Sequence, residues 1–125
     1  MAHTRQSILI VDDDVLSIEF LVDILHQDYT LFIAKDGEAA IHLAALHRPH
    51  LILLDIIMPG IDGYQTIDYL HSLEELQQTP IVFISSLTST LHQELGRELN
   101  ADAYLEKPLT ASQVLTCVQT QLSKG

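Results

Sequence analysis

The feature that most constrains the fold of this chain is an alternation of short apolar runs with longer amphipathic segments. The runs are SILIVD (7–12), TLFIA (30–34), LILLD (51–55), IVFIS (81–85) and AYLEK (103–107). The first, third and fourth are continuously apolar, which is typical of strands buried on both faces of a parallel sheet. Between the runs, apolar residues recur at a spacing of three and four, as on one face of a helix. The pattern predicts helices over 15–27, 36–47, 64–73, 88–98 and 110–122.

Five strand–helix units in succession predict an α/β fold, a three-layer doubly wound (βα)5 sandwich around a five-stranded parallel sheet. The chain has 125 residues, which is close to the commonest size of one domain. No internal repeat or linker divides it, so we expect residues 1–125 to form a single domain. Asp14 stands just before the first predicted helix and Asp36 opens the second, where a carboxylate favours the helix N-terminus.

The charge of the chain argues against direct binding to nucleic acid. The formal net charge is −11, and the six lysines and arginines are scattered rather than clustered. Binding along a phosphate backbone needs a basic patch, so we expect no direct binding to nucleic acid. No apolar run approaches the roughly 20 residues of a membrane span, and the N-terminal MAHTRQS does not resemble a signal peptide. The single cysteine, Cys117, fits a reducing compartment, so we expect a cytoplasmic protein without membrane contact.

Polar residues stand at the ends of four of the five predicted strands. They are Asp12, Asp13 and Asp14 after the first strand, Asp55 at the third, Ser85 and Ser86 at the fourth, and Lys107 at the fifth. Parallel strands end on one edge of a sheet, about 4.8 Å apart, and sites form where the strand order reverses. If the first strand neighbours the third, three carboxylates share one pocket, with Ser85 and Lys107 on its far side.

This set of residue types indicates phosphoryl chemistry. Three neighbouring carboxylates repel one another unless a cation lies between them. Mg²⁺ suits such a position because it accepts carboxylate oxygens while keeping waters and phosphate oxygens as ligands. A lysine and a hydroxyl opposite would suit the remaining oxygens of a phosphoryl group. The residues alone therefore predict magnesium-assisted phosphoryl chemistry with an aspartate as the nucleophile.

The sequence resembles the receiver domain of two-component response regulators, the CheY-like family. The resemblance covers essentially the whole chain and rests on ILIVDDD (8–14), LILLDIIMPGIDGYQ (51–65), PIVFISS (80–86) and ADAYLEKPL (101–109). It implies the flavodoxin-like strand order 2-1-3-4-5. It also implies Mg²⁺, for which Mn²⁺ can substitute, and a phosphoryl donor that is a sensor histidine kinase or a phosphotransfer protein.

The resemblance assigns the acceptor and the metal ligands residue by residue. Asp55 matches the phosphoacceptor and also contacts the metal. Asp13 matches a direct ligand of Mg²⁺, Asp12 a ligand through water, and the backbone carbonyl of Ile57 a further ligand.

The resemblance also assigns the phosphoryl-binding and switch residues. Lys107 matches the catalytic lysine that pairs with the phosphoryl oxygens, and a cis bond before Pro108 is typical of the family. The Ser85 hydroxyl and the Ser86 backbone would contact the same oxygens. Ser85 and Tyr104 match the switch pair, whose movement alters the face formed by the fourth helix, fifth strand and fifth helix. That face would control a partner or an attached output domain, which we expect to lie outside this chain.

Two alternatives remain open at the level of sequence. A receiver that signals by binding alone would share the fold, although the complete set of site residues favours phosphorylation. An aspartyl-phosphate hydrolase of the haloacid dehalogenase type would use Asp12 and Asp14, two residues apart after the first strand. It would leave Asp55 without a role.

Some positions depart from the family pattern. Ile57 and Leu87 are apolar where the family positions water near the phosphoryl group, so we expect slow hydrolysis of the aspartyl phosphate. Asn100 stands near a usual glycine, and we expect a positive φ there. The fifth helix has no Arg or Asp, which makes dimerisation through ion pairs on that face less expected.

The seven histidines lack metal-ligand spacing and are interpreted as surface or loop residues.

Overall fold

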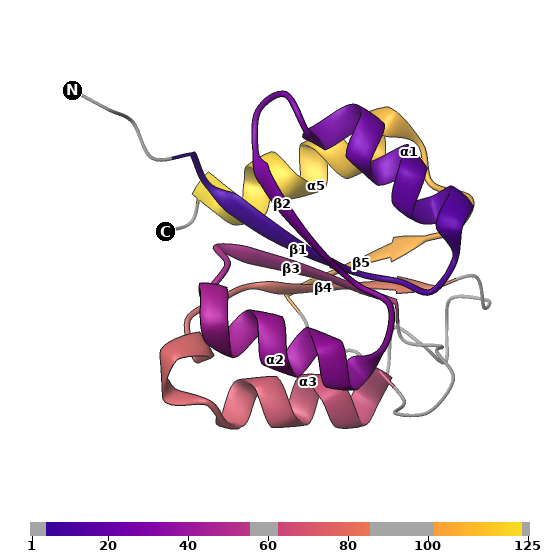
Figure 1. The fold of residues 1–125 in the computed structure, drawn as a ribbon. Helices are drawn as coiled ribbons and strands as arrows, with labels where there is room; N and C mark the ends of the chain where they lie inside the picture. Colours follow the sequence, from indigo (N-terminus) through magenta and orange to yellow (C-terminus); the bar gives the residue numbers. More distant parts are fainter. Residues whose placement is uncertain (1–4, 56–62, 86–101, 124–125) are drawn as a thin grey trace.

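The computed structural model describes residues 5–55, 63–85 and 102–123, which form a sheet between two helical layers (Figure 1). The strands are β1 (Ser7–Val11), β2 (Thr30–Ala34), β3 (Leu51–Asp55), β4 (Ile81–Ser85) and β5 (Ala103–Glu106). The helices are α1 (Val15–Leu25), α2 (Gly37–His47), α3 (Gly63–Ser72) and α5 (Ala111–Ser123), with a 3-10 turn, η1, at Glu74–Leu76. All strand pairs are parallel, in the order β2-β1-β3-β4-β5, which confirms the predicted class and order.

The burial of each strand follows from its place in the sheet. Every residue of β1, β3 and β4 is buried, because helices cover both faces of the central strands. The outer strands β2 and β5 are partly exposed. The three continuously apolar runs are therefore the three central strands, as the pattern predicted.

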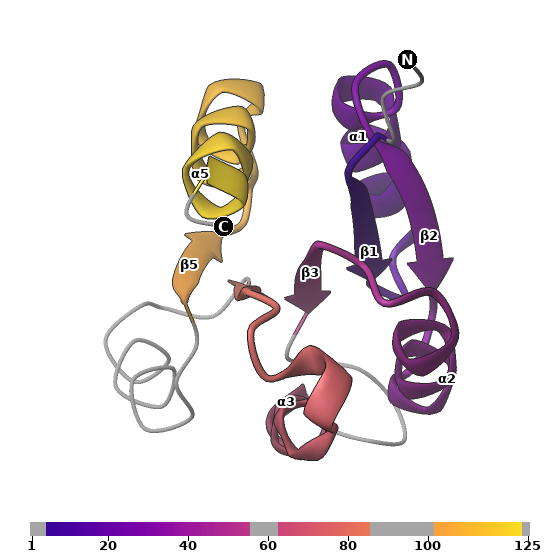
Figure 2. The ribbon, with the colours of Figure 1, turned by 90° about the vertical axis from the view of Figure 1, so that its left-hand side faces the viewer.

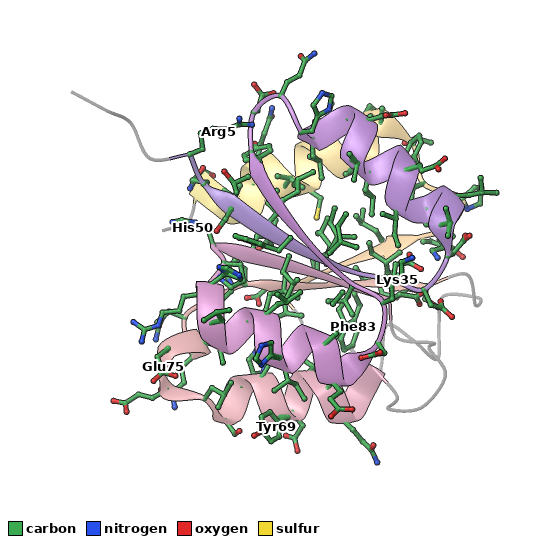
Figure 3. All side chains as sticks on the ribbon, viewed as in Figure 1. Arg5, Lys35, His50, Tyr69, Glu75 and Phe83 are labelled. Atoms are coloured by element: carbon green, nitrogen blue, oxygen red, sulfur yellow. The ribbon has the colours of Figure 1, made fainter. Side chains whose placement is uncertain are left out.

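Helices α1 and α5 cover one face of the sheet, and α2 and α3 cover the other (Figure 2). Alternate strand residues point to opposite faces, which divides the core into two clusters. The first contains Leu9, Val11, Ile52, Leu54 and Phe83 with residues of α2 and α3. The second contains Ile8, Ile10, Leu51 and Leu53 with residues of α1 and α5. Phe83 is the largest fully buried side chain among the described residues and lies between the sheet and α2 (Figure 3).

The helix ends agree with the sequence within two residues where the chain is described. Asp14 caps α1 by accepting the Leu16 N–H at 3.2 Å, and Asp36 caps α2 by accepting the Ala39 N–H at 2.7 Å. The first helix was predicted to end at residue 27, but α1 ends at Leu25. The helix predicted over 88–98 and the positive φ predicted at Asn100 lie outside the described residues. In the part of the chain that is described, no helix is long and apolar enough to cross a membrane.

The strand register brings the polar strand ends together. Val11 pairs with Leu54, Asp55 with Ile84, and Ser85 with Glu106. The residue after β1 therefore lies beside the last residue of β3, and the residue after β5 lies two strands further along the same edge. Two backbone hydrogen bonds extend this register past the strands, from Asp12 N to Ala34 O at 3.0 Å and from Lys107 N to Ser85 O at 2.7 Å.

Candidate functional site

Three carboxylates converge at the carboxyl edge of the sheet. Asp12, Asp13 and Asp55 each offer one oxygen, and these oxygens lie within 4.8 Å of one another. Asp12 and Asp55 are buried, whereas Asp13 is exposed. The pocket shared by these three residues was predicted from the strand ends, and the structure confirms it. The three oxygens form an acidic cluster with one side open to solvent.

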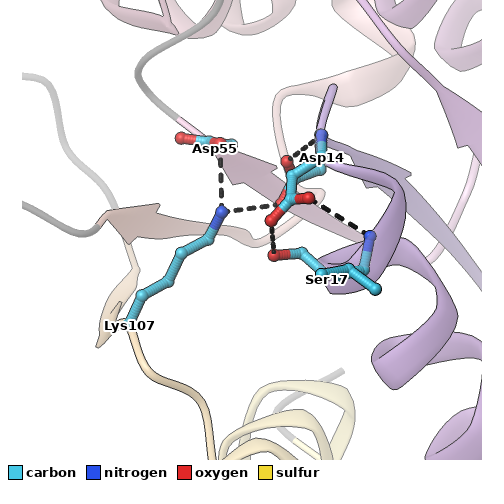
Figure 4. Close-up of polar contacts among 6 residues, drawn as sticks. Asp14, Ser17, Asp55 and Lys107 are labelled. Atoms are coloured by element: carbon cyan, nitrogen blue, oxygen red, sulfur yellow. Dashed lines mark hydrogen bonds and ion pairs between the residues drawn. The ribbon is translucent and has the colours of Figure 1, made fainter.

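Lys107 follows β5 on the far side of the pocket, and its ammonium reaches two carboxylates of this acidic cluster. Its Nζ is 3.1 Å from Asp12 Oδ2 and 3.3 Å from Asp55 Oδ2, so one ammonium bridges two carboxylates (Figure 4). The long side chain reaches from the end of β5 past β4 to the ends of β1 and β3. Burial alone lowers the pKa of Lys107, but the contact with Asp12 and the charges of Asp55 and Asp12 outweigh it and raise the pKa above its ordinary value.

The two oxygens of Asp12 have different surroundings. Oδ1 accepts the backbone N–H of Asp14 at 2.9 Å. Oδ2 is buried and has no hydrogen-bond partner among the described residues, although the Lys107 ammonium is close. A buried carboxylate oxygen that has an ion pair but no hydrogen bond, beside two further carboxylates, is a donor set that suits a hard divalent cation. The residues present therefore fit Mg²⁺, with Asp12, Asp13 and Asp55 as the residues that would hold it.

Asp14 belongs to the end of α1 rather than to the cluster. Its carboxylate accepts the Leu16 N–H and, at 2.9 Å, the Ser17 hydroxyl. The bond from Ser17, followed by that from Leu16, lowers the pKa of Asp14. Because both oxygens serve the helix cap, Asp14 is not placed to act as the second carboxylate of a haloacid-dehalogenase-type pair.

Ser85 and Tyr104 lie together on neighbouring strands. Ser85 is fully buried at the end of β4, and Tyr104 of β5 is partly buried. Burial raises the pKa of the Tyr104 hydroxyl, and a hydrogen bond with the Ser85 side chain opposes that rise. The two residues expected to move together are thus already in contact in this structure.

Some predicted features fall outside the described residues, and others are confirmed. Ile57, Ser86 and Leu87 are among the residues not described. The peptide bond between Lys107 and Pro108 is cis, as the resemblance implied. Cys117 is partly buried and packs against the core on the α5 side.

The histidine interpretation holds for most of the described residues. Those that are exposed are His26, His42, His47 and His50, whereas His71 at the end of α3 is partly buried. His50 has a structural contact that the sequence did not reveal, because its Nδ1 accepts the Ser7 N–H at 2.9 Å.

Sequence reasoning missed two features of the site. It did not foresee that Lys107 contacts Asp12 as well as Asp55, because nothing in the sequence gives the reach of a side chain across three strands. It also missed the bond from Ser17 to Asp14. A serine three residues after a helix-capping aspartate was the signal that could have found this bond.

The chain is similar to known proteins along nearly all its length. The model of the response regulator receiver domain family matches residues 8–119. The DNA-binding response regulator MtrA of Mycobacterium tuberculosis is 34% identical over 100% of this chain and 54% of its own length. A probable cyclic di-GMP phosphodiesterase of Vibrio cholerae is 34% identical over 94% of this chain and 28% of its own. The structure of chemotaxis protein CheY4 of Vibrio cholerae superposes with a TM-score of 0.90 at 25% identity, covering 95% of this chain and 100% of CheY4.

Proposed function

Because this chain belongs to the response regulator receiver domain family, a family of signalling domains, we propose that it is a phosphorylation-dependent switch with Asp55 as the phosphoacceptor. The observation that carries the proposal is the convergence of Asp12, Asp13, Asp55 and the Lys107 ammonium at one end of the sheet. Asp13 would hold Mg²⁺ directly and Asp12 through water, with the Ile57 carbonyl as a further ligand. The bound cation would neutralise charge on the carboxylates and on the phosphoryl oxygens.

The transfer step is a nucleophilic substitution at phosphorus. A carboxylate oxygen of Asp55 forms a bond to the phosphorus atom while the bond from phosphorus to the donor's imidazole nitrogen breaks. The bonding electron pair and a proton go to that nitrogen, which leaves a neutral imidazole on the donor. Lys107 would stabilise the negative charge of the transferred group. Its ammonium already contacts Asp55 and would pair with the new phosphoryl oxygens. Its raised pKa supports a protonated side chain throughout the neutral range.

The donor would be a sensor histidine kinase or a phosphotransfer protein. An exposed apolar pair beside the site supports a macromolecular donor. Leu16 and Val15, in the first turn of α1, are 74% and 52% exposed. Leu16 also lines a small cavity together with Lys107 and Pro108. A partner that covers these apolar side chains would bring its histidine to the edge of the acidic cluster.

The conformational response to phosphorylation would be transmitted from the site through Ser85 and Tyr104. The Ser85 hydroxyl and the Ser86 backbone would bind phosphoryl oxygens, and Tyr104 would follow Ser85 because the two side chains are in contact. A bound phosphoryl group would shift a population of conformations rather than create a new fold. The affected face would control a partner or an attached output domain. The chain spans 28% and 54% of the length of these two curated relatives.

The proposal is tested by intact-mass spectrometry after incubation with acetyl phosphate and Mg²⁺. One added phosphoryl group is expected in the parent chain, and none is expected without Mg²⁺ or in the Asp55→Asn variant. Asp36→Asn is the matched control, because it neutralises an aspartate that caps α2 outside the acidic cluster. Equal labelling of the parent and the Asp55→Asn variant would show that another residue is the acceptor. An unlabelled parent that still responds to beryllofluoride would favour a receiver that depends on a dedicated donor. An unlabelled parent without that response would favour signalling by binding alone.

A further inference from the structure

We propose that Asp14 and Ser17 are positioning residues that hold the Asp12 carboxylate in the orientation in which it serves a divalent cation. We refer to these two side chains and their mutual hydrogen bond as the Asp14–Ser17 clasp. The inference rests on the proposed function, because it concerns how the same acidic cluster is arranged. It assigns a task to two residues that the transfer step itself does not use.

The orientation of Asp12 is set by one backbone group. The Asp14 N–H donates to Asp12 Oδ1 at 2.9 Å, an Asx turn in which the side chain bonds to the backbone two residues on. With Oδ1 held, Oδ2 lies 3.1 Å from the Lys107 ammonium, buried, and within the acidic cluster. Rotation of the carboxylate would break the bond to Asp14, so the direction of Oδ2 depends on where the Asp14 N–H points.

The Asp14–Ser17 clasp fixes that N–H. Asp14 has an extended backbone, with φ −88° and ψ 113°, as the N-cap of α1. One carboxylate oxygen accepts the Leu16 N–H at 3.2 Å, and the other accepts the Ser17 hydroxyl at 2.9 Å. Both oxygens are therefore tied to the first turn of α1, and the backbone of Asp14 is tied with them (Figure 4). An N-cap usually stabilises only its helix, whereas this one also orients a carboxylate of the site.

The chain contains a matched cap without this connection. Asp36 is the N-cap of α2, has an extended backbone, and accepts the Ala39 N–H at 2.7 Å. That bond stays within the first turn of α2 and contacts no residue of the acidic cluster. Asp36→Ala therefore removes a comparable cap and loses comparable helix stability, while it leaves Asp12 untouched.

The test is a calorimetric titration of Mg²⁺ into the unphosphorylated chain and its variants, paired with thermal unfolding. Removing a group that orients a metal ligand typically weakens metal binding by about 10- to 100-fold. We expect a loss at the low end of that range for Asp14→Ala and a smaller loss for Ser17→Ala. Asp36→Ala should lower the unfolding midpoint about as much as Asp14→Ala does, with unchanged Mg²⁺ affinity.

The charge of Asp14 is separated from its geometry by Asp14→Asn, since asparagine is also a good N-cap. This variant should recover most of the affinity that Asp14→Ala loses. A second readout needs no metal: hydrogen exchange of the Asp14 amide should be faster in Ser17→Ala than in the parent. Parent-like affinity in both Asp14→Ala and Ser17→Ala would overturn the inference, and so would equal losses in Asp14→Asn and Asp14→Ala. A parent chain that fails to bind Mg²⁺ would instead overturn the proposed metal site, and the inference with it.

Discussion

Replacing Lys107 with methionine should destabilise the metal-free protein by about 3 kcal/mol. At 3.1 and 3.3 Å, each attraction between the ammonium and a carboxylate is roughly 5 kcal/mol at an effective dielectric constant of about 20. Desolvation of the three groups offsets a large part of this. Removing one partner of a buried pair typically costs about 3–5 kcal/mol, because the other charge is left uncompensated. The Lys107 side chain retains 18% exposure, which places the expected loss at the lower end.

The assay is urea unfolding of the parent and of Lys107→Met, at neutral pH, with and without Mg²⁺. Mg²⁺ should stabilise the variant more than the parent, because in the parent the cation must compete with an ammonium already between Asp12 and Asp55. Lys35→Met is the matched control, since Lys35 is exposed and follows β2 at the same edge (Figure 3). Its effect should stay within about 0.5 kcal/mol. If Lys107→Met were as stable as the Lys35 control without Mg²⁺, the bridging ammonium would not be needed to compensate the buried carboxylates.

Three further predictions concern other residues. The pKa of Asp14 is lowered in the folded chain by the Ser17 hydroxyl and then by the Leu16 N–H, so its contribution to stability is present above the ordinary aspartate pKa and is lost as the pH falls through the lowered value. The difference in unfolding free energy between the parent and Asp14→Ala should therefore shrink below about pH 4, and a difference that persists to the lowest measurable pH would contradict this. Tyr104→Phe should cost about 1 kcal/mol through the lost hydrogen bond with Ser85, and should remove one late-titrating tyrosine from an ultraviolet pH titration. Loss of a component that titrates in the ordinary tyrosine range would instead show that Tyr104 ionises normally. Ile57→Asn should accelerate loss of the phosphoryl group from Asp55, because an amide can orient water where isoleucine cannot, and mass spectrometry over time would reveal an equal or slower rate if this is wrong.

The strands of the sheet and most of the helices that pack on it were predictable from the local pattern of apolar residues. Strands 30–34, 51–55 and 81–85 begin and end as predicted, because a short apolar run between polar segments leaves little choice of boundary. The caps at Asp14 and Asp36 were predictable for the same reason, since a helix start is a local event. The 3-10 turn that follows α3 was not predicted. Helix α3 stops at Ser72, and η1 carries the chain to Leu76, which is buried against the core.

Other features depend on contacts between distant parts of the chain. Gln121 is buried in α5, and its amide donates to the distant Asp102 carbonyl at 3.5 Å. Arg48 closes α2 with φ 48°, a left-handed conformation for which the sequence offers no glycine. Its N–H still bonds to the Ala44 carbonyl at 2.9 Å. Nothing within a few residues of Gln121 or Arg48 signals either outcome.

The sequence by itself determined which residues stand at the carboxyl edge, because each one ends or closely follows a predicted strand. It could not determine how their charges balance. Asp12 is 1% exposed while Asp13 beside it is exposed, and the cation that compensates Asp12 comes from Lys107, 95 positions later in the chain. Burial and charge compensation are properties of the packed sheet, since they depend on which strands become neighbours and how far a side chain reaches across them. Local sequence thus identifies the residues of the site, whereas the tertiary structure determines their burial and their ion pairs.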